Sequence, residues 1–253
     1  MHQGNRKTAS KASLIAGFRA VTEAVEAGKE LDKVLIQKGL QGDLAKALRA
    51  LLQQHSIPYQ FVPPAKLSQL TRAHHQGVVA FLSEITFARL DEVVQQCFES
   101  GTDPRIVMLD HVTDVRNFGA ICRSAECFGV HAVVIPEKGA AQINAEAVKA
   151  SAGALLALPV CREKDLMAAL RKLRDSGLRI AACTEKGAQD LNHAALRGPL
   201  CVVLGAEDTG VSHEILRIAD DLIRIPLSGR VSSLNVSVAA GIFFYQWAVD
   251  AHI

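Results

Sequence analysis

Several features that mark other protein classes are missing from this chain of 253 residues. No apolar run approaches the roughly 18 residues that a membrane-spanning helix needs. The first residues, 1–8, lack the apolar core of a secretory signal peptide. None of the six cysteines belongs to a Cys-x-x-Cys pair, and most lie inside apolar segments. These absences argue against a membrane protein, a disulfide scaffold and a metal site. They favour a cytoplasmic protein with reduced, buried cysteines.

Two common nucleotide-binding patterns are also missing. The chain has no G-x-G-x-x-G fingerprint, and Gly210 is followed by Val211 where a phosphate loop would require lysine. A nucleotide-dependent oxidoreductase is therefore the weakest of the functions considered.

Hydrophobic periodicity indicates an α/β protein. Apolar residues make up 49% of the chain and charged residues 21%, which is enough to bury one large core or two modest ones. Downstream of residue 105, short Val/Ile/Leu runs alternate with helical patterns, as in a parallel sheet covered on both faces. We predict an amphipathic helix over 166–174 and strands at 106–109, 132–135, 159–161, 179–183, 201–204 and 222–225.

The first third of the chain has a different pattern and a different charge. We predict helices over 13–27, 42–55 and 64–71 with strands at 34–37, 59–62 and 77–82, giving a small α/β domain over 1–88. A helical linker over 89–104 then leads to a second domain over 105–253. The first 88 residues carry 11 Lys+Arg against 6 Asp+Glu, and the remainder carries 17 against 20. This asymmetry favours contact with a polyanion, although ordinary solubilising charge explains it equally well.

The segment 110–129 follows a predicted strand and contains its own helix. We expect Asn117 to cap that helix and Gly119 to allow a tight turn against a ligand or a neighbouring strand. Arg123 has apolar neighbours in the sequence, so we expect it to need an anionic partner. That partner is either a ligand or, equally, a carboxylate such as Glu126.

Two later segments also end predicted strands in polar loops. In 200–212 a buried strand ends at Gly205 and is followed by Glu207. In 225–241 a Ser/Gly/Arg loop opens into an apolar helix that starts near Leu234 or Asn235. Open α/β sheets bind ligands at such positions. Ser and Asn are also good helix caps, so a well-capped helix start is an equally simple explanation.

In this order the three segments resemble the three motifs of the SPOUT (trefoil-knot, TrmH-type) RNA methyltransferases. Gly17, 33–36 and 75–80 are similar to the ribosomal-protein-L30e-like substrate-binding domain. That domain precedes the catalytic domain in the 23S rRNA guanosine-2′-O-methyltransferases of the RlmB type. The resemblance implies a small L30e-like domain, a knotted parallel-sheet catalytic domain, S-adenosylmethionine as cofactor, RNA as substrate and a homodimer that shares its active sites.

The resemblance also implies roles for single residues. It assigns catalysis to Arg123, although free arginine has a pKa above about 12 and is a poor base, so we expect it to position phosphate and stabilise an alkoxide. Asn117 and Asn235 match positions that orient the ribose or one another. Ser233 would hold the hydroxyl, and Glu207 would fix Arg123 or a base edge.

The implied cofactor site lies in the loops after the last two strands. Backbone groups hold the adenine there, which explains why no acidic ribose-binding residue stands out. The matching positions, with two neighbours, are Gly205, Ile225, Leu227, Leu234 and Val236.

The last helix, 236–249, is predicted to supply part of the dimer interface, with Phe244 as an example. An ordinary buried helix fits the same pattern. The chain departs from the family at Arg230 in the third motif and at Val115–Arg116, where Pro-His is common. A tRNA ribose methyltransferase and a non-catalytic RNA-binding or ribosome-assembly protein remain alternatives. The tRNA enzymes typically lack the N-terminal domain.

Overall fold

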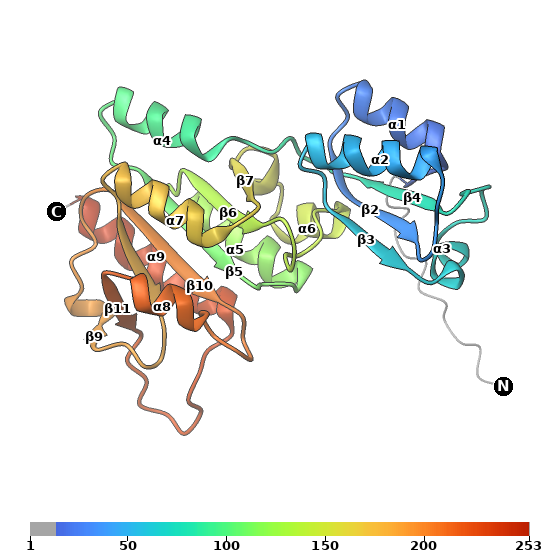
Figure 1. The fold of residues 1–253 in the computed structure, drawn as a ribbon. Helices are drawn as coiled ribbons and strands as arrows, with labels where there is room; N and C mark the ends of the chain where they lie inside the picture. The colour runs from blue at the N-terminus through green and yellow to red at the C-terminus, as the bar shows by residue number, and fades with distance from the viewer. Residues whose placement is uncertain (1–13, 253) are drawn as a thin grey trace. The chain divides into compact units, whose positions relative to one another are not determined.

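A computed structural model describes residues 14–252, with side chains through Asp250. The chain divides into two compact units (Figure 1). The first contains the described residues up to Glu84 together with Ile143–Glu146. The second contains Ile85–Gln142 and the described residues from Ala147 onward.

The first unit is a four-stranded mixed sheet with helices on both faces (Figure 1). The strand order is β1-β4-β2-β3, and only the pair β2–β3 is parallel. Apolar residues of α1 and α2 pack on one face, and Leu67 of α3 packs on the other. The elements are β1 Leu14–Ala16, α1 Phe18–Glu26, β2 Leu31–Gln37, α2 Asp43–Gln54, β3 Tyr59–Val62, α3 Pro64–Leu70 and β4 Val78–Leu82.

The helix predicted over 13–27 is wrong at its start. Leu14–Ala16 forms a strand that pairs antiparallel with β4, and the helix begins only at Phe18. Gly17 separates the two, with a φ of 98° that favours glycine, and its amide donates to the Val78 carbonyl at 3.0 Å. Residue 13 lies outside the described residues. Three apolar residues before a helix fit either pattern, so only pairing with β4 decides between them.

The second unit is built on a seven-stranded parallel sheet, and the predicted α/β class is confirmed. Strand β8 has the predicted bounds, the other predicted strands differ by one or two residues at their ends, and the short strand β9 was not predicted. In spatial order the strands are β7 Val160–Glu163, β6 Ala132–Pro136, β5 Arg105–Asp110, β10 Leu200–Gly205, β8 Arg179–Cys183, β11 Asp221–Arg224 and β9 Gln189–Asp190.

Helices cover both faces of this sheet (Figure 1). Apolar residues of α4, α7 and α8 share one core cluster with Ile106, Met108, Val134 and Val203. On the other face α5 packs against α9, which also contacts β10. The helices are α4 Leu90–Glu99, α5 Val115–Cys127, α6 Ala145–Ala150, α7 Leu166–Asp175, α8 His213–Ile218 and α9 Val236–His252, with 3-10 turns η1 Ala154–Leu156 and η2 Leu191–His193. No helix among the described residues is long and apolar enough to cross a bilayer.

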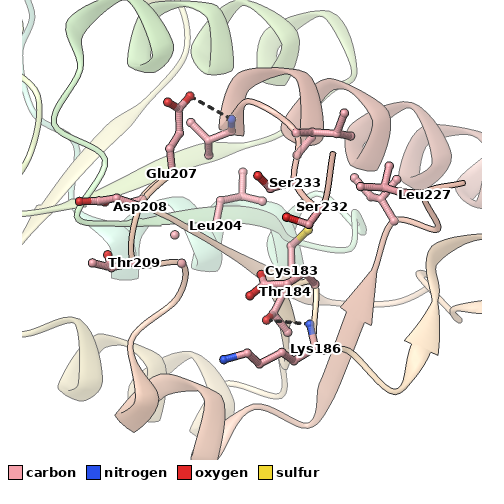
Figure 2. A pocket seen from close by; sticks show the side chains of 18 residues that line it. Cys183, Thr184, Lys186, Leu204, Glu207, Asp208, Thr209, Leu227, Ser232 and Ser233 are labelled. Carbon is pink, nitrogen blue, oxygen red and sulfur yellow. Dashed lines mark hydrogen bonds between the residues drawn. The ribbon is translucent and has the colours of Figure 1, made fainter. Parts of the chain in front are cut away.

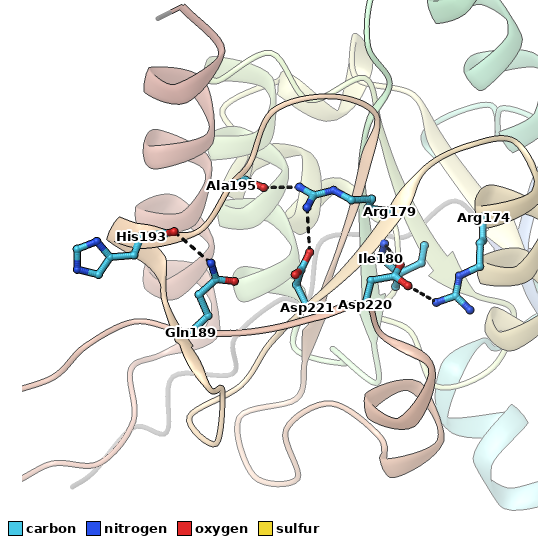
Figure 3. Close-up of polar contacts among 8 residues, drawn as sticks. All are labelled: Arg174, Arg179, Ile180, Gln189, His193, Ala195, Asp220 and Asp221. Atoms are coloured by element: carbon cyan, nitrogen blue, oxygen red, sulfur yellow. Dashed lines mark hydrogen bonds and ion pairs between the residues drawn. The ribbon is translucent and has the colours of Figure 1, made fainter.

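Charged side chains brace the β8–β11 part of the sheet (Figure 3). Asp220 accepts from Arg174 at 2.9 Å and from the Ile180 amide at 2.8 Å. Arg179 pairs with Asp221 at 3.3 Å and donates to the Ala195 carbonyl. These contacts hold together the starts of β8 and β11.

Phe244 is a core residue, which corrects its choice as a dimer contact. Phe243 and Phe244 are fully buried and Trp247 is 2% exposed. The exposed apolar residues of α9 are instead Val238 (49%), Ile242 (40%) and Tyr245 (59%), at spacings of four and three residues on one stripe. An α9 that is apolar on two faces gives no sequence signal for which face is buried.

Candidate active site

The carboxyl ends of the central parallel strands meet at one edge of the second unit's sheet. Gly205 at the end of β10 lies in register with Asp110 at the end of β5, and β8 lies on the other side of β10. Loops after β8, β10 and β11 enclose a cavity of about 400 Å³ (Figure 2). This volume lies within the range of small-molecule sites.

The cavity gathers most of the residues predicted from the sequence. All five predicted cofactor positions line it, as do Glu207 and Ser233 of the predicted polar set. The five are Gly205, Ile225, Leu227, Leu234 and Val236. Figure 2 shows Ser232 and Ser233 on the loop before α9 and Leu227 on the loop after β11.

The loop after β8 also lines the cavity, and the sequence interpretation had placed the site only in the loops after the last two strands. Thr184, Glu185 and Lys186 all contribute, and Asp208 and Thr209 are further additions from the loop after β10. Glu185 is an acidic residue at the cavity, and no sequence pattern had identified it as a candidate for binding the cofactor. The signal was available, because strand 179–183 was predicted and all strands of a parallel sheet end on the same side.

Two glycines allow these loops to approach closely. A Cβ on Gly205 would lie 2.0 Å from the carbonyl carbon of Gly210, where the loop folds back and the Gly210 amide donates to the Ala206 carbonyl at 2.9 Å. A Cβ on Gly187 would lie 2.7 Å from the Arg224 amide of β11. Both positions therefore require glycine because backbone occupies the space of a side chain.

A side-chain network at the rim of the cavity joins all three motif segments. Glu207 Oε1 accepts from Asn117 Nδ2 at 2.9 Å, from Asn235 Nδ2, and from the Val236 amide at 3.3 Å. Asn235 Nδ2 also donates to Asn117 Oδ1 at 3.0 Å. Glu207 thus orients the two asparagines, not Arg123. The contact between the asparagines is one of the two arrangements that were expected.

Asn117 does not cap its helix, which corrects that expectation. Helix α5 starts at Val115, and Asp114 is its cap, accepting from the Arg116 amide at 2.9 Å and the Asn117 amide at 2.8 Å. Aspartate caps as well as asparagine does and comes three residues earlier. The Asn117 side chain is therefore available to Glu207.

Gly119 serves helix packing and not the expected tight turn. It lies within α5, and a Cβ there would come within 2.5 Å of the Ala150 Cβ on α6 and 2.8 Å of the Ala147 carbonyl oxygen. Close approach of α5 and α6 thus depends on this glycine.

Asn235 caps α9 and belongs to the network at the same time. Its Oδ1 accepts from the amides of Ser237 at 2.9 Å and Val238 at 3.3 Å, while its Nδ2 donates to Glu207 and Asn117. The capping and the functional interpretations of this residue are therefore compatible.

Arg123 lies apart from this network within one chain. It is exposed, and it makes no hydrogen bond or ion pair with any residue from 14 to 250, Glu126 included. Because Arg123 follows Asn117 by six residues in a helix, it lies about 9 Å further along the helix axis and about 120° around it. The carboxylate alternative, Glu126, is therefore wrong, because water solvates the exposed guanidinium; an anionic ligand as the partner of Arg123 stays a prediction.

The chemistry of the cavity disfavours a cysteine nucleophile and fits a cationic cofactor. Burial raises the pKa of the Cys183 thiol to about 11, so this lining residue stays protonated at neutral pH. Three carboxylates line the cavity against one lysine. S-adenosylmethionine carries a sulfonium and an ammonium against one carboxylate, and the apolar side chains of the Ile225–Val236 loop suit its adenine. Among residues 14–252, no three His, Cys, Asp or Glu side chains gather as metal ligands would.

Two known families match this chain. The SpoU rRNA methylase family matches residues 104–245, and the family of RNA 2′-O-ribose methyltransferase substrate-binding domains matches residues 14–88. YacO of Bacillus subtilis, named for the TrmH family of tRNA/rRNA methyltransferases, is 32% identical over 92% of this chain and 93% of its own length. A protein of Staphylococcus haemolyticus with the same family name is 33% identical over 92% of this chain and 94% of its own.

Solved structures resemble the chain as well. The SpoU methyltransferase AviRb of Streptomyces viridochromogenes, crystallised with AdoMet, has a TM-score of 0.58 and 26% identity. That match covers 97% of this chain and 94% of AviRb. The A. aeolicus TrmH/SpoU tRNA modifying enzyme has a TM-score of 0.54 and 29% identity. It covers 64% of this chain and 83% of that enzyme.

Proposed function

Since the chain belongs to the SpoU rRNA methylase family and is an S-adenosylmethionine-dependent RNA 2′-O-ribose methyltransferase, we propose that it methylates a guanosine ribose of 23S rRNA, as enzymes of the RlmB type do. The target would be a nucleotide of the peptidyl-transferase-centre loop. This substrate implies a cytoplasmic location.

The N-terminal unit is the observation that favours rRNA over tRNA. It matches a substrate-binding family over 14–88, and the first 88 residues carry an excess of five positive charges. The tRNA modifying enzyme of A. aeolicus matches only 64% of this chain. We assign RNA binding to 1–88, a linker to 89–104 and methyl transfer to 105–253.

The rim network suggests how the chain prepares the target ribose. S-adenosylmethionine, when bound among Gly205, Ile225 and Leu234, supplies a methyl group on a sulfonium. Glu207 fixes the amides of Asn117 and Asn235, so that they present a preset pattern of donors and acceptors to the ribose. Ser233 lies on the same loop and holds the 2′-hydroxyl.

Arg123 would act on the RNA phosphate and the developing alkoxide. Because Arg123 lies apart from the network of its own chain, a second copy supplies it in this proposal. The exposed stripe Val238, Ile242 and Tyr245 on α9, beside α5, is the surface on which that copy would pack. The dimer is thus part of the mechanism.

The interface can be tested at Ile242. Ile242→Asp should give a folded monomer with methyl transfer reduced at least a hundredfold, because a charge on the stripe opposes burial. Sedimentation and methyl transfer should be measured together, with Leu156→Asp as the control at another exposed apolar residue. A soluble, fully active monomer would rule out the shared site.

The substrate can be tested with transcripts. Methyl transfer should be compared on 23S rRNA fragments and on tRNA made in vitro, followed by mapping of the modified nucleotide. Activity on tRNA alone would replace the rRNA proposal. Absence of cofactor binding by calorimetry would instead support a non-catalytic RNA-binding or ribosome-assembly protein.

A further inference from the structure

We propose that Lys186 binds the carboxylate of the methionine portion of S-adenosylmethionine, so that the loop after β8 recognises the end of the cofactor opposite the adenine. This inference rests on the proposed cofactor site and adds a residue that neither the motifs nor the rim network include. Lys186 lines the cavity, and Figure 2 shows its side chain extending from that loop.

The loop that carries Lys186 is held in place by its backbone. The Thr184 amide donates to the Ile223 carbonyl of β11 at 2.9 Å, and the Gly187 amide donates to the Thr184 carbonyl at 3.0 Å. Gly187 lies so close to β11 that no side chain fits there. Lys186 therefore projects from a tight turn whose ends are fixed.

The Lys186 ammonium is available for a ligand. Its side chain is exposed and makes no hydrogen bond or ion pair with any other residue of the described part of the chain. The carboxylates on the same cavity, Glu185 and Asp208, do not pair with it. An ammonium with three donors thus faces the cavity without a protein acceptor.

The charges that line the cavity favour an anionic group of the ligand only near Lys186. Lys186 is the single cation among the residues that line it, against the carboxylates Glu185, Glu207 and Asp208. The sulfonium and the ammonium of the cofactor suit those carboxylates. Its one carboxylate would be repelled by all three and is attracted only by Lys186.

The test compares two ligands of which only one carries the carboxylate of the proposed contact. S-adenosylhomocysteine carries the amino acid portion, and 5′-methylthioadenosine lacks it. Titration calorimetry should show that Lys186→Met weakens S-adenosylhomocysteine binding about three- to tenfold and leaves 5′-methylthioadenosine within twofold. Lys186→Arg should keep both affinities, and Lys172→Met on α7 is the control for lost charge.

Each other outcome has a defined meaning. Equal losses for both ligands would show that Lys186 supports the loop or the adenosine portion, and unchanged binding of both would assign it elsewhere, for instance to RNA phosphate. Either result overturns the inference while the proposed function stands. If neither ligand binds the wild-type protein, the cofactor site itself is misassigned. Thermal unfolding of each variant checks that it is folded.

Discussion

The two units of this protein differ in the sequence separation that some of their side-chain pairs span. In the first unit, the side-chain pairs Gln53–Tyr59 and Ser68–His75 join residues six and seven positions apart. In the second, Asn117 contacts Glu207 and Asn235 across 90 and 118 positions. The two local pairs are exposed at the surface and join residues close together in the sequence. Contacts over 90 or more positions form only after the fold has brought the segments together. The long-range contacts show that the network of Asn117, Glu207 and Asn235 depends on the fold of the second unit, which agrees with the proposed reaction centre.

The largest expected effect is at Arg123. Arg123→Ala should abolish methyl transfer, with a loss of at least about a thousandfold, because phosphate and alkoxide lose their cation. Cofactor affinity should stay within a few-fold, since Arg123 does not line the cavity. Single-turnover assays and calorimetry measure the two effects, with Arg171→Ala on α7 as the matched control. An equal loss of cofactor affinity would make Arg123 a cofactor or structural residue.

Removal of residues 1–88 tests whether the units divide the work. The second unit has its own core, so the truncated protein should fold and bind S-adenosylhomocysteine. Methyl transfer to 23S fragments should fall about a hundredfold because the excess positive charge of 1–88 is gone. Wild-type activity of the truncated protein would show that the first unit is dispensable for target choice.

Glu207 is the residue on which the long-range network converges. Glu207→Ala should lower the rate of methyl transfer ten- to a hundredfold and the free energy of unfolding by about 1–2 kcal/mol, because three donors lose their acceptor. Chemical denaturation and single-turnover kinetics report the two. A change in stability without a change in rate would reduce the network to a structural role.

The smallest effect is expected for the local pair in the first unit. Gln53→Ala removes an exposed contact of 3.4 Å to the Tyr59 hydroxyl and should change the free energy of unfolding by less than about 0.5 kcal/mol. A loss comparable to that of Glu207→Ala would remove the contrast between the two units.

The sequence predicted most strands and helices correctly, but it predicted their ends less well. Strand 179–183 and strand 59–62 have the predicted bounds, because buried runs between breakers leave few alternatives. Leu14–Ala16 was misassigned because its partner strand lies more than 60 positions away, and Phe244 because an apolar helix does not reveal its buried face.

The candidate site was predictable where it depends on residue types in order, and not where it depends on contacts. Gly205, Glu207 and Asn235 come from motif order and meet at one cavity or its rim. Whether Asp114 or Asn117 caps α5 is decided by the hydrogen bonds of its first turn. The separation of Arg123 from the network is decided by its angle around α5. The capping contact is a property of three-dimensional placement that residue spacing does not specify, whereas the angle of Arg123 follows from spacing once the helix is known.

The side chain of Asn235 has two hydrogen-bonding roles, and together they couple the start of α9 to the rim network. One side-chain amide closes the first turn of the helix with its oxygen and holds Glu207 and Asn117 with its nitrogen. Fraying of that turn would therefore also release Asn235 from the rim network. By thermodynamic reciprocity, whatever favours an ordered α9 favours an ordered site. If the proposed second copy packs on the exposed stripe of α9, a ligand that orders the site tightens that association to the same degree.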